Sequence, residues 1–144
     1  MSTVEPATPS RAFAWHHVVR ATLRDTDGMG HVNNAVYLSW MEEARTGYVI
    51  DRRGFRGLED VDFVLASATV DYRSPVFLGE TVDVWCVPSR VGDSSWDLDY
   101  EARVRGDGRL VLEGRTVQVQ YDYRNRRPAA LPEEWRRLLQ EDLT

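Results

Sequence analysis

Features that would direct a chain to a membrane or out of the cell are missing from this sequence. The only cysteine, Cys86, has no partner for an internal disulfide, so nothing points to an oxidising compartment. No apolar run approaches the roughly 18 to 20 residues of a membrane span. Residues 1–11 contain Glu5, Pro6 and Pro9 where a signal peptide needs an apolar stretch. We therefore predict a cytoplasmic protein with no membrane segment, in which residues 1–12 form a flexible tail.

Clustered basic charge and several enzyme motifs are missing as well. The net charge is −5 and only residues 124–127 are locally basic, which argues against nucleic-acid binding. The chain has neither the G-x-S-x-G turn of serine hydrolases nor a G-x-x-x-x-G-K-[ST] phosphate loop. His16 and His17 have no companions at metal-ligand spacing, and residues 25–28 lack the later ligands of a calcium loop. We expect no bound metal and no resident cofactor.

Strand patterns fill most of the chain. With 144 residues, 42% of them hydrophobic, and no internal repeat, residues 13–144 are predicted to form one domain. Residues 96–105 alternate between an apolar face and a charged face, so we expect the charged face to be exposed to solvent. Turns are predicted at 88–93 and 105–108. Alternating apolar residues predict strands at 15–23, 64–72, 79–86, 96–105 and 117–123.

One long helix is predicted near the front of the chain. Apolar residues at helical spacing form a stripe that ends before Gly54, and Asn33 or Asn34 is a favoured N-cap. Because apolar residues also occur off this stripe, the helix should be enclosed by a curved sheet or covered by a partner subunit. Pro132 can start a short last helix. The fold class is therefore α+β. The stripe consists of Tyr37, Trp40, Met41, Ala44 and Tyr48.

The most informative stretch joins a carboxylate to the start of this helix. It reads Asp27-Gly-Met-Gly-His-Val-Asn-Asn34, followed directly by the helical pattern. The glycines let the backbone turn tightly, and the first turn of a helix has unpaired N–H groups that can stabilise negative charge on a carbonyl oxygen. An aspartate beside them could attack that carbonyl or activate water. Asp27 could equally be a turn residue that bonds nearby backbone.

These residues resemble the hot-dog-fold acyl-CoA thioesterases, in particular the 4-hydroxybenzoyl-CoA thioesterase branch with its D-x-x-G-H-V-N-N-x-x-Y pattern. The resemblance covers about residues 14–123 and is sharpest over 23–45. It implies an antiparallel sheet of about five strands wrapped around one long central helix, with a short C-terminal helix. It also implies that Asp27 is the catalytic nucleophile or general base and that the backbone N–H of Asn34 polarises the carbonyl.

Other candidate residues surround this pair. His31 is expected to belong to the loop architecture, and some relatives place a histidine where this chain has Asn34. Another branch of the family uses a glutamate on the central helix, which makes Glu42 and Glu43 candidates. The simpler interpretation is that they pair with Arg45 or Arg52, or lie at a subunit interface. Asp25 could share the face of Asp27. The substrate-binding candidates are Gly30, His31, Asn33, Tyr37, Arg73 and Arg90, the two arginines as contacts for CoA phosphates.

The resulting hypothesis is a thioesterase that hydrolyses an acyl-CoA to a free acid and CoA. Coenzyme A is then part of the substrate and no further cofactor is needed. The resemblance implies a homodimer or homotetramer with the site at a subunit boundary. Two alternatives stay open: release of an acyl chain from an acyl carrier protein, and a noncatalytic acyl-CoA-binding module.

Overall fold

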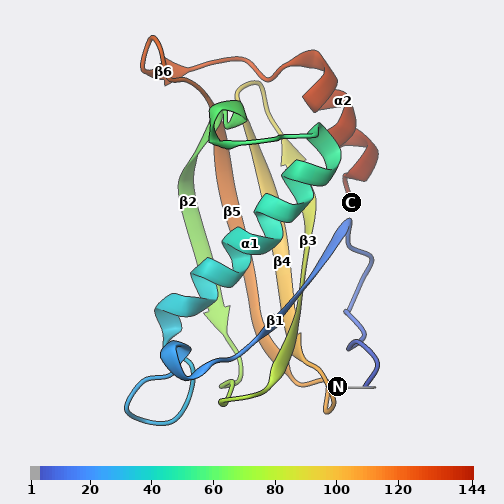
Figure 1. Cartoon of the computed structure of the whole chain (residues 1–144). Coiled ribbons are helices and arrows are strands. Elements are labelled where there is room, and N and C mark those ends of the chain that lie inside the picture. Colours follow the sequence, from blue (N-terminus) through green and yellow to red (C-terminus); the bar gives the residue numbers. More distant parts are fainter. Residues whose placement is uncertain (1–3) are drawn as a thin grey trace.

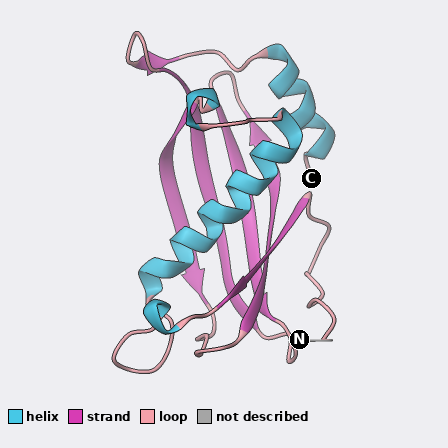
Figure 2. Ribbon diagram, in the orientation of Figure 1, coloured by secondary structure: helices cyan, strands magenta, loops and turns pink. Residues whose placement is uncertain are grey.

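The computed structural model describes residues 4–144, which form one antiparallel sheet and two α-helices (Figures 1 and 2). No helix among these residues is long and apolar enough to cross a membrane. Short 3-10 turns occupy Leu23–Asp25 and Leu58–Asp60. The elements are β1 (Trp15–Arg20), α1 (Asn34–Arg53), β2 (Phe63–Tyr72), β3 (Thr81–Val91), β4 (Ser95–Val104), β5 (Leu110–Asp122), β6 (Arg127–Pro128) and α2 (Glu133–Asp142).

The sheet curls around α1. Its strand order is β1-β3-β4-β5-β2, every neighbouring pair is antiparallel, and β6 adds two residues to β5. Figure 1 shows α1 crossing the concave side of the sheet, with α2 at the end of the sheet opposite the loop that leads into α1. The α+β class and the wrapped central helix are therefore confirmed.

The ends and the buried face of α1 follow from its sequence. The Asn33 side chain caps the helix by accepting a hydrogen bond from the Ala35 N–H at 2.9 Å. At the other end the N–H of Gly54, in the left-handed region, donates to Ile50 O. All five residues of the predicted stripe are buried, which confirms the helix. Of the two predicted N-cap candidates, Asn33 is the cap.

A glycine lets α1 lie directly on β1. A Cβ atom at Gly47 would lie only 2.6 Å from Nε1 of Trp15, so no side chain fits between the helix and this indole. The contact lies in the second half of the helix, beyond most of the apolar stripe that meets the sheet. The distance between helix and strand is thus set at this point by the absence of a methyl group.

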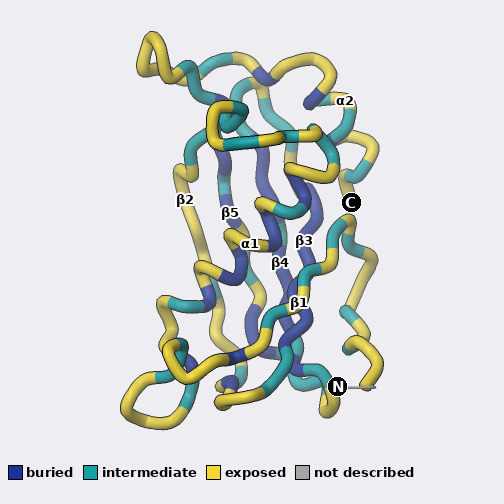
Figure 3. Tube along the Cα trace, in the orientation of Figure 1, coloured by how far each residue is buried: buried dark blue, intermediate teal, exposed yellow. Residues whose placement is uncertain are grey.

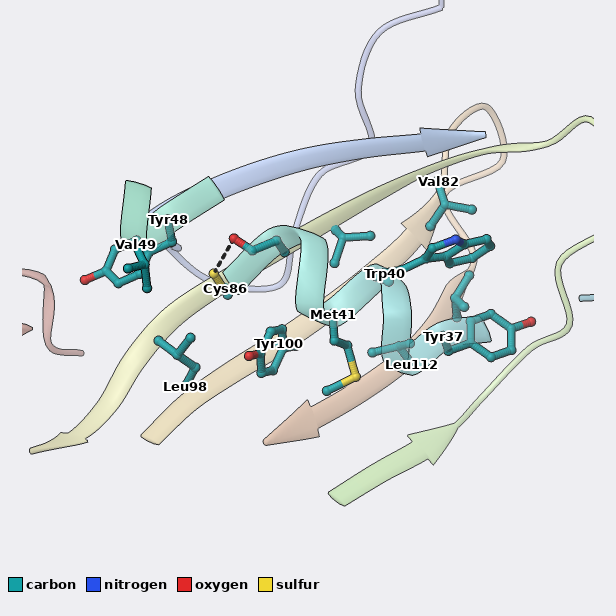
Figure 4. Packing of buried hydrophobic residues seen from close by; sticks show 14 of the residues in the cluster. Tyr37, Trp40, Met41, Tyr48, Val49, Val82, Cys86, Leu98, Tyr100 and Leu112 are labelled. Atoms are coloured by element: carbon teal, nitrogen blue, oxygen red, sulfur yellow. Dashed lines mark hydrogen bonds between the residues drawn. The ribbon is translucent and has the colours of Figure 1, made fainter. Parts of the chain in front are cut away.

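The core lies between α1 and the concave face of the sheet. Figure 4 shows side chains of α1 meeting those of the strands, with the Cys86 thiol 3.8 Å from the carbonyl oxygen of Ala44. At the far end α2 adds Trp135, whose ring meets Trp96 edge-on at 5.1 Å between centroids. Trp135 and Leu139 are buried, so α2 contributes one side to the core.

The charged face of β4 is buried, so the prediction of a wet face is wrong. Asp97 and Glu101 are 5% and 3% exposed, and Asp83 of the neighbouring strand is fully buried. The N-terminal segment covers this face: the Ala7 N–H donates to Asp83 Oδ2 at 2.9 Å and the Ser10 N–H to Glu101 Oε2 at 2.8 Å. The alternating pattern shows which side chains are polar but not whether they are exposed to solvent. Here arginine side chains and backbone N–H groups cover the polar face.

The N-terminal prediction concerns residues 1–12. Residues 1–3 lie outside the described part of the chain. Within the rest, the bonds of Ala7 and Ser10 are joined by an ion pair between Arg11 and Asp99 at 2.9 Å. Residues 7–11 therefore rest on the convex face of the sheet. The flexibility of this segment in solution remains a prediction.

The turn predicted at 88–93 is also wrong, because β3 continues to Val91. Pro88 pairs with Leu98 of β4, and a bulge directly after it leaves Ser89 without a partner before Arg90 pairs with Asp97. The turn itself is tight and lies at Gly92, whose N–H donates to Ser95 O. Similarly, β5 begins at Leu110 rather than at residue 117, because the hairpin after β4 is short.

Strand β2 is the most exposed long strand of the sheet. Figure 3 shows it as a largely exposed edge, whereas β3 and β4 are dark with buried residues. Tyr72 is exposed although it belongs to the alternating set that predicts one buried face, and Leu65, which lies outside that set, is exposed as well. The set is Val64, Ala66, Ala68, Val70 and Tyr72. The groove where this edge faces the helix, here named the α1–β2 seam, contains two cavities that are described below.

Candidate active site

The loop between β1 and α1 holds Asp27 in a tight turn. The Asp27 N–H donates to His31 O at 3.0 Å, and the Gly30 N–H donates back to Asp27 O at 3.3 Å. Gly30 has φ 89°, which is the positive region that the glycine prediction requires. The Val32 N–H then donates to Val76 O at 2.8 Å, so the loop is fixed to the segment before β3.

The Asp27 carboxylate uses one oxygen for the turn and keeps the other open. Oδ1 accepts the Met29 N–H at 2.7 Å, which is the turn role considered from the sequence. Oδ2 lies 4.0 Å from Nδ1 of the His31 ring. The side chain is 35% exposed. An oxygen with open lone pairs can still act as a nucleophile or accept a proton.

The start of α1 presents an unpaired backbone donor beside this loop. The Asn33 side chain takes the Ala35 N–H, and the Asn33 carbonyl takes the Val36 N–H. Among the described residues no acceptor lies within hydrogen-bond reach of the Asn34 N–H. This donor lies at the positive end of the helix dipole, where a developing oxyanion is stabilised.

A cavity of about 240 Å³ opens at this end of the α1–β2 seam. Among its lining residues are four of the predicted site residues: His31, Asn34, Tyr37 and Arg73. Asp27 does not line it directly and reaches it through His31. The structure therefore brings the carboxylate, the helix start and a cavity into one region.

Tyr72 is a site residue that the sequence pattern assigned only to a strand face. Its hydroxyl donates to the carbonyl oxygen of Asn34 at 3.0 Å and its ring lies 5.5 Å from that of Tyr37. The Tyr37 hydroxyl in turn accepts the Val76 N–H at 3.3 Å, and burial raises the Tyr37 pKa. The signal that could have found Tyr72 is its place at the end of a strand, directly before Arg73 and the Ser-Pro break.

Other candidates are held elsewhere. Asp25 Oδ2 accepts from the Thr22 N–H and hydroxyl, so it caps the preceding turn. Glu43 pairs with His17 at 3.1 Å, and Glu42 Oε2 lies 3.8 Å from Arg45.

The two arginine candidates differ in position. Arg73 lines the cavity and pairs with Glu113 at 3.1 Å. Arg90 lies at the opposite end of β3 from Thr81, which pairs with β1 beside the loop, and it binds Asp97 at 2.8 Å. Within one chain Arg90 is therefore not part of this site. Among residues 4–144 no group of three His, Cys, Asp or Glu side chains is arranged to hold a metal ion.

Known proteins share this architecture. The family model described as the thioesterase-like superfamily matches residues 21–139. The long-chain acyl-CoA thioesterase FadM of Escherichia coli is 26% identical over 113 residues, covering 77% of this chain and 86% of that protein. A 1,4-dihydroxy-2-naphthoyl-CoA hydrolase of Nostoc punctiforme is 28% identical over 127 residues, covering 85% and 83%.

Among solved structures, a thioesterase of Thermus thermophilus complexed with coenzyme A and Zn is 36% identical. It superposes with a TM-score of 0.81 over 90% of this chain and 99% of its own. The family match spans both the Asp27 loop and the whole of α1. The chain therefore belongs to the thioesterase-like superfamily, and it is a hot-dog-fold enzyme that hydrolyses thioesters.

Proposed function

We propose that the enzyme hydrolyses acyl-CoA to a free carboxylic acid and CoA, with Asp27 as the catalytic carboxylate. The observation that carries the proposal is an open Asp27 oxygen 4.0 Å from His31, together with an unpaired Asn34 N–H, where His31 and Asn34 both line one cavity. The names of the relatives support the substrate class, because FadM is a long-chain acyl-CoA thioesterase and the Thermus protein was solved with coenzyme A.

Two routes fit this arrangement. In the first, Asp27 Oδ2 attacks the thioester carbonyl, CoA leaves as the thiolate, and water hydrolyses the resulting mixed anhydride. In the second, Asp27 takes a proton from water as that water attacks, and the proton passes to the departing sulfur. Both routes place negative charge on the carbonyl oxygen, which the Asn34 N–H stabilises.

His31 and Tyr72 support the reacting groups. His31 is 4.0 Å from Asp27 and borders the cavity, so it orients the carboxylate towards the substrate. Tyr72 anchors the carbonyl of Asn34 and thereby holds the first turn of α1. Arg73 is half exposed beside the cavity and can approach a CoA phosphate.

The proposed enzyme is an oligomer, because α1 and β2 expose apolar side chains. Leu38 and Ile50 of α1 are 43% and 48% exposed, and Leu65 of the edge strand β2 is 48% exposed. Apolar surface beside an open strand edge favours association with another chain. We propose a homodimer or homotetramer in which this surface is covered, and we keep a cytoplasmic location as a prediction.

The test is a panel of short, long, branched and aromatic acyl-CoAs, with release of free CoA thiol as the readout. We expect turnover of at least one class, and Asp27→Asn should lower it by at least about 10²-fold. The same acyl group on an acyl carrier protein separates the two substrate forms, since our proposal expects CoA to be preferred. Binding of acyl-CoA without turnover by the wild-type protein would refute the proposal in favour of a noncatalytic module.

A further inference from the structure

Arg45 is a buried cation that lines a second cavity in the α1–β2 seam. Its residue exposure is 6%, although it lies in the middle of a helix whose other buried positions are mainly apolar. The cavity has a volume of about 160 Å³, and its walls include Leu38 and Met41 of α1, and Leu65 and Ala68 of β2. A guanidinium therefore forms one wall of a largely apolar cavity.

The hydrogen-bonding capacity of Arg45 is mostly unused inside the protein. A guanidinium has five N–H donors. Among the described residues its polar contacts are the Tyr100 hydroxyl at 3.3 Å and Glu42 Oε2 at 3.8 Å, and the Glu42 side chain is 70% exposed. Arg53 on the same helix shows the usual arrangement, with two hydrogen bonds to Asp62 at 2.6 and 2.8 Å. Arg45 has no comparable anion.

The buried groups around Arg45 are neutral. Burial raises the pKa of Tyr100 to about 12, so its hydroxyl stays protonated and shares a 2.7 Å hydrogen bond with Thr116. Burial also raises the pKa of the Cys86 thiol, with Arg45 opposing the shift. Glu42 is the negatively charged residue on the cavity wall, and solvent screens it. A buried guanidinium in such surroundings has room for a further oxygen ligand.

The position of this cavity relates it to the proposed site. Tyr72, at the end of β2, meets Asn34, while Ala68 and Leu65 lie earlier on the same strand and border the second cavity. From Asn34 to Arg45 is eleven residues, about 16 Å along a helix, and helical side chains lean back towards the N-terminus. The two cavities have no lining residue in common, and an acyl chain that runs along the helix from the first to the second would bring its far end to the guanidinium.

We propose that Arg45 is a specificity-determining residue that selects acyl groups carrying an oxygen, as a hydroxyl or carboxylate, at the end distant from the thioester. This inference rests on the proposed acyl-CoA hydrolysis and adds the substrate class. The apolar walls hold the hydrocarbon part, and the guanidinium donates hydrogen bonds to the distal oxygen. An acyl group with a methyl end leaves those donors unpaired in a buried space.

The experiment compares hexanoyl-, octanoyl- and decanoyl-CoA with their ω-hydroxy and ω-carboxy forms. We expect the wild-type enzyme to favour an oxygen-bearing form at one chain length by about tenfold or more in kcat/KM, the size expected for a hydrogen bond to a charged group. Arg45→Met should bring that ratio close to one. Arg45→Lys keeps the positive charge but lacks the planar guanidinium that can donate two parallel hydrogen bonds, so it should give an intermediate ratio.

Arg53→Met is the matched control, because it makes the same change on the same helix. It should lower the melting temperature by leaving Asp62 without its cation and with only the Gln120 side-chain amide as a hydrogen-bonding side chain, yet keep the substrate ratio. Arg45→Met should melt at or above the wild-type temperature, since replacing a poorly paired buried charge with an apolar side chain is often stabilising. A structural role for Arg45 would instead lower its melting temperature while leaving the substrate ratio intact, and that result overturns the proposal.

Failure of the two proposals can be told apart. If no acyl-CoA is hydrolysed, the proposed function fails, and calorimetric binding of octanoyl-CoA and its ω-carboxy form to wild type and Arg45→Met still tests Arg45. Tighter binding of the ω-carboxy form by wild type but not by Arg45→Met supports the inference. Equal binding of both thioesters, or a wild-type preference for methyl-ended acyl groups at every length, refutes it.

Discussion

Two aspartates in this molecule lie in opposite environments, Asp83 on the convex face of the sheet and Asp27 in the loop before α1. Asp83 is fully buried and accepts hydrogen bonds from Arg105 at 2.6 Å, His16 at 2.7 Å and the Ala7 N–H at 2.9 Å. Asp27 is 35% exposed and has one backbone donor. Burial alone would raise the Asp83 pKa, but hydrogen bonds from Arg105, Ala7 and His16 outweigh it and lower the pKa.

The difference teaches which carboxylates can react. A carboxylate whose lone pairs are all taken by fixed donors stabilises the fold but has nothing left for a substrate. Asp27 has an open oxygen beside a cavity and an unpaired helix donor. Strong burial and a shifted pKa therefore mark the structural group in this protein, and incomplete hydrogen bonding marks the candidate for catalysis.

The largest expected effect is on the rate of hydrolysis, which should depend on Asp27 but not on Asp83. Asp27→Asn should lower kcat by at least about 10²-fold, because an amide neither attacks the carbonyl nor takes a proton. The melting temperature should stay unchanged, because the amide oxygen can still accept the Met29 N–H. Steady-state hydrolysis and calorimetry measure both quantities. Asp25→Asn is the control and should reduce kcat far less, and a variant Asp27→Asn with wild-type turnover would exclude Asp27 from the chemistry.

Acid should act on the convex face as a group. The pKa values of Asp83, Asp99 and Glu101 are lowered, since hydrogen bonds from arginines and other donors outweigh burial in each case. Groups with depressed folded-state pKa values stabilise the fold fully above their unfolded values of about 4, and this contribution is lost as pH falls through the folded values. Melting curves between neutral pH and about pH 3 should show the loss, and a flat profile would contradict it.

Asp83→Asn is expected to give the converse of Asp27→Asn. It leaves Arg105 without its buried anion, so the free energy of unfolding should fall by about 2 kcal/mol, less than for a fully buried pair because Arg105 is partly solvated. The rate of hydrolysis should not change when measured below the melting temperature. Denaturant unfolding and kinetics on the same sample provide the measurement. Loss of activity in the folded variant would mean that the two regions are coupled.

The smallest effect concerns the cap of α1. Asn33→Ala removes the acceptor for the Ala35 N–H and should lower the free energy of unfolding by about 1 kcal/mol. Because the cap also fixes the turn that contains the Asn34 N–H, kcat should fall by less than about tenfold. Asn33→Ser restores an acceptor oxygen and should recover stability and rate together. Recovery of stability without rate would show that the Asn33 amide itself contacts the substrate.

Local patterns in the sequence were sufficient for the elements that hold the site. The cap at Asn33 and the buried stripe of α1 depend on residues close in sequence, and the structure confirms both. His31, Asn34 and Tyr37 belong to the D-x-x-G-H-V-N-N-x-x-Y pattern, and in the structure all three line one cavity. These features could be predicted because neighbouring residues decide turn, cap and helix face.

Features that depend on distant partners could not be predicted. The charged face of β4 is buried because residues 7–11 and arginines from other strands cover it. Arg90 was a candidate contact for CoA phosphates from the sequence, and only the strand pairing shows that it lies at the far end of β3. The contact of Tyr72 with Asn34 joins residues 38 positions apart. Such pairings appear only once the strand order is known.

The tight contact of Gly47 with the Trp15 indole has a mechanical consequence for the enzyme. The helix is a rigid rod seated on β1 at this point and tied to the end of β2 by Tyr72 at the other. A bulkier residue at position 47 would push α1 away from Trp15 and tilt the N-terminal end of the helix. We therefore expect residue 47, almost four turns away, to affect the direction in which the Asn34 N–H points.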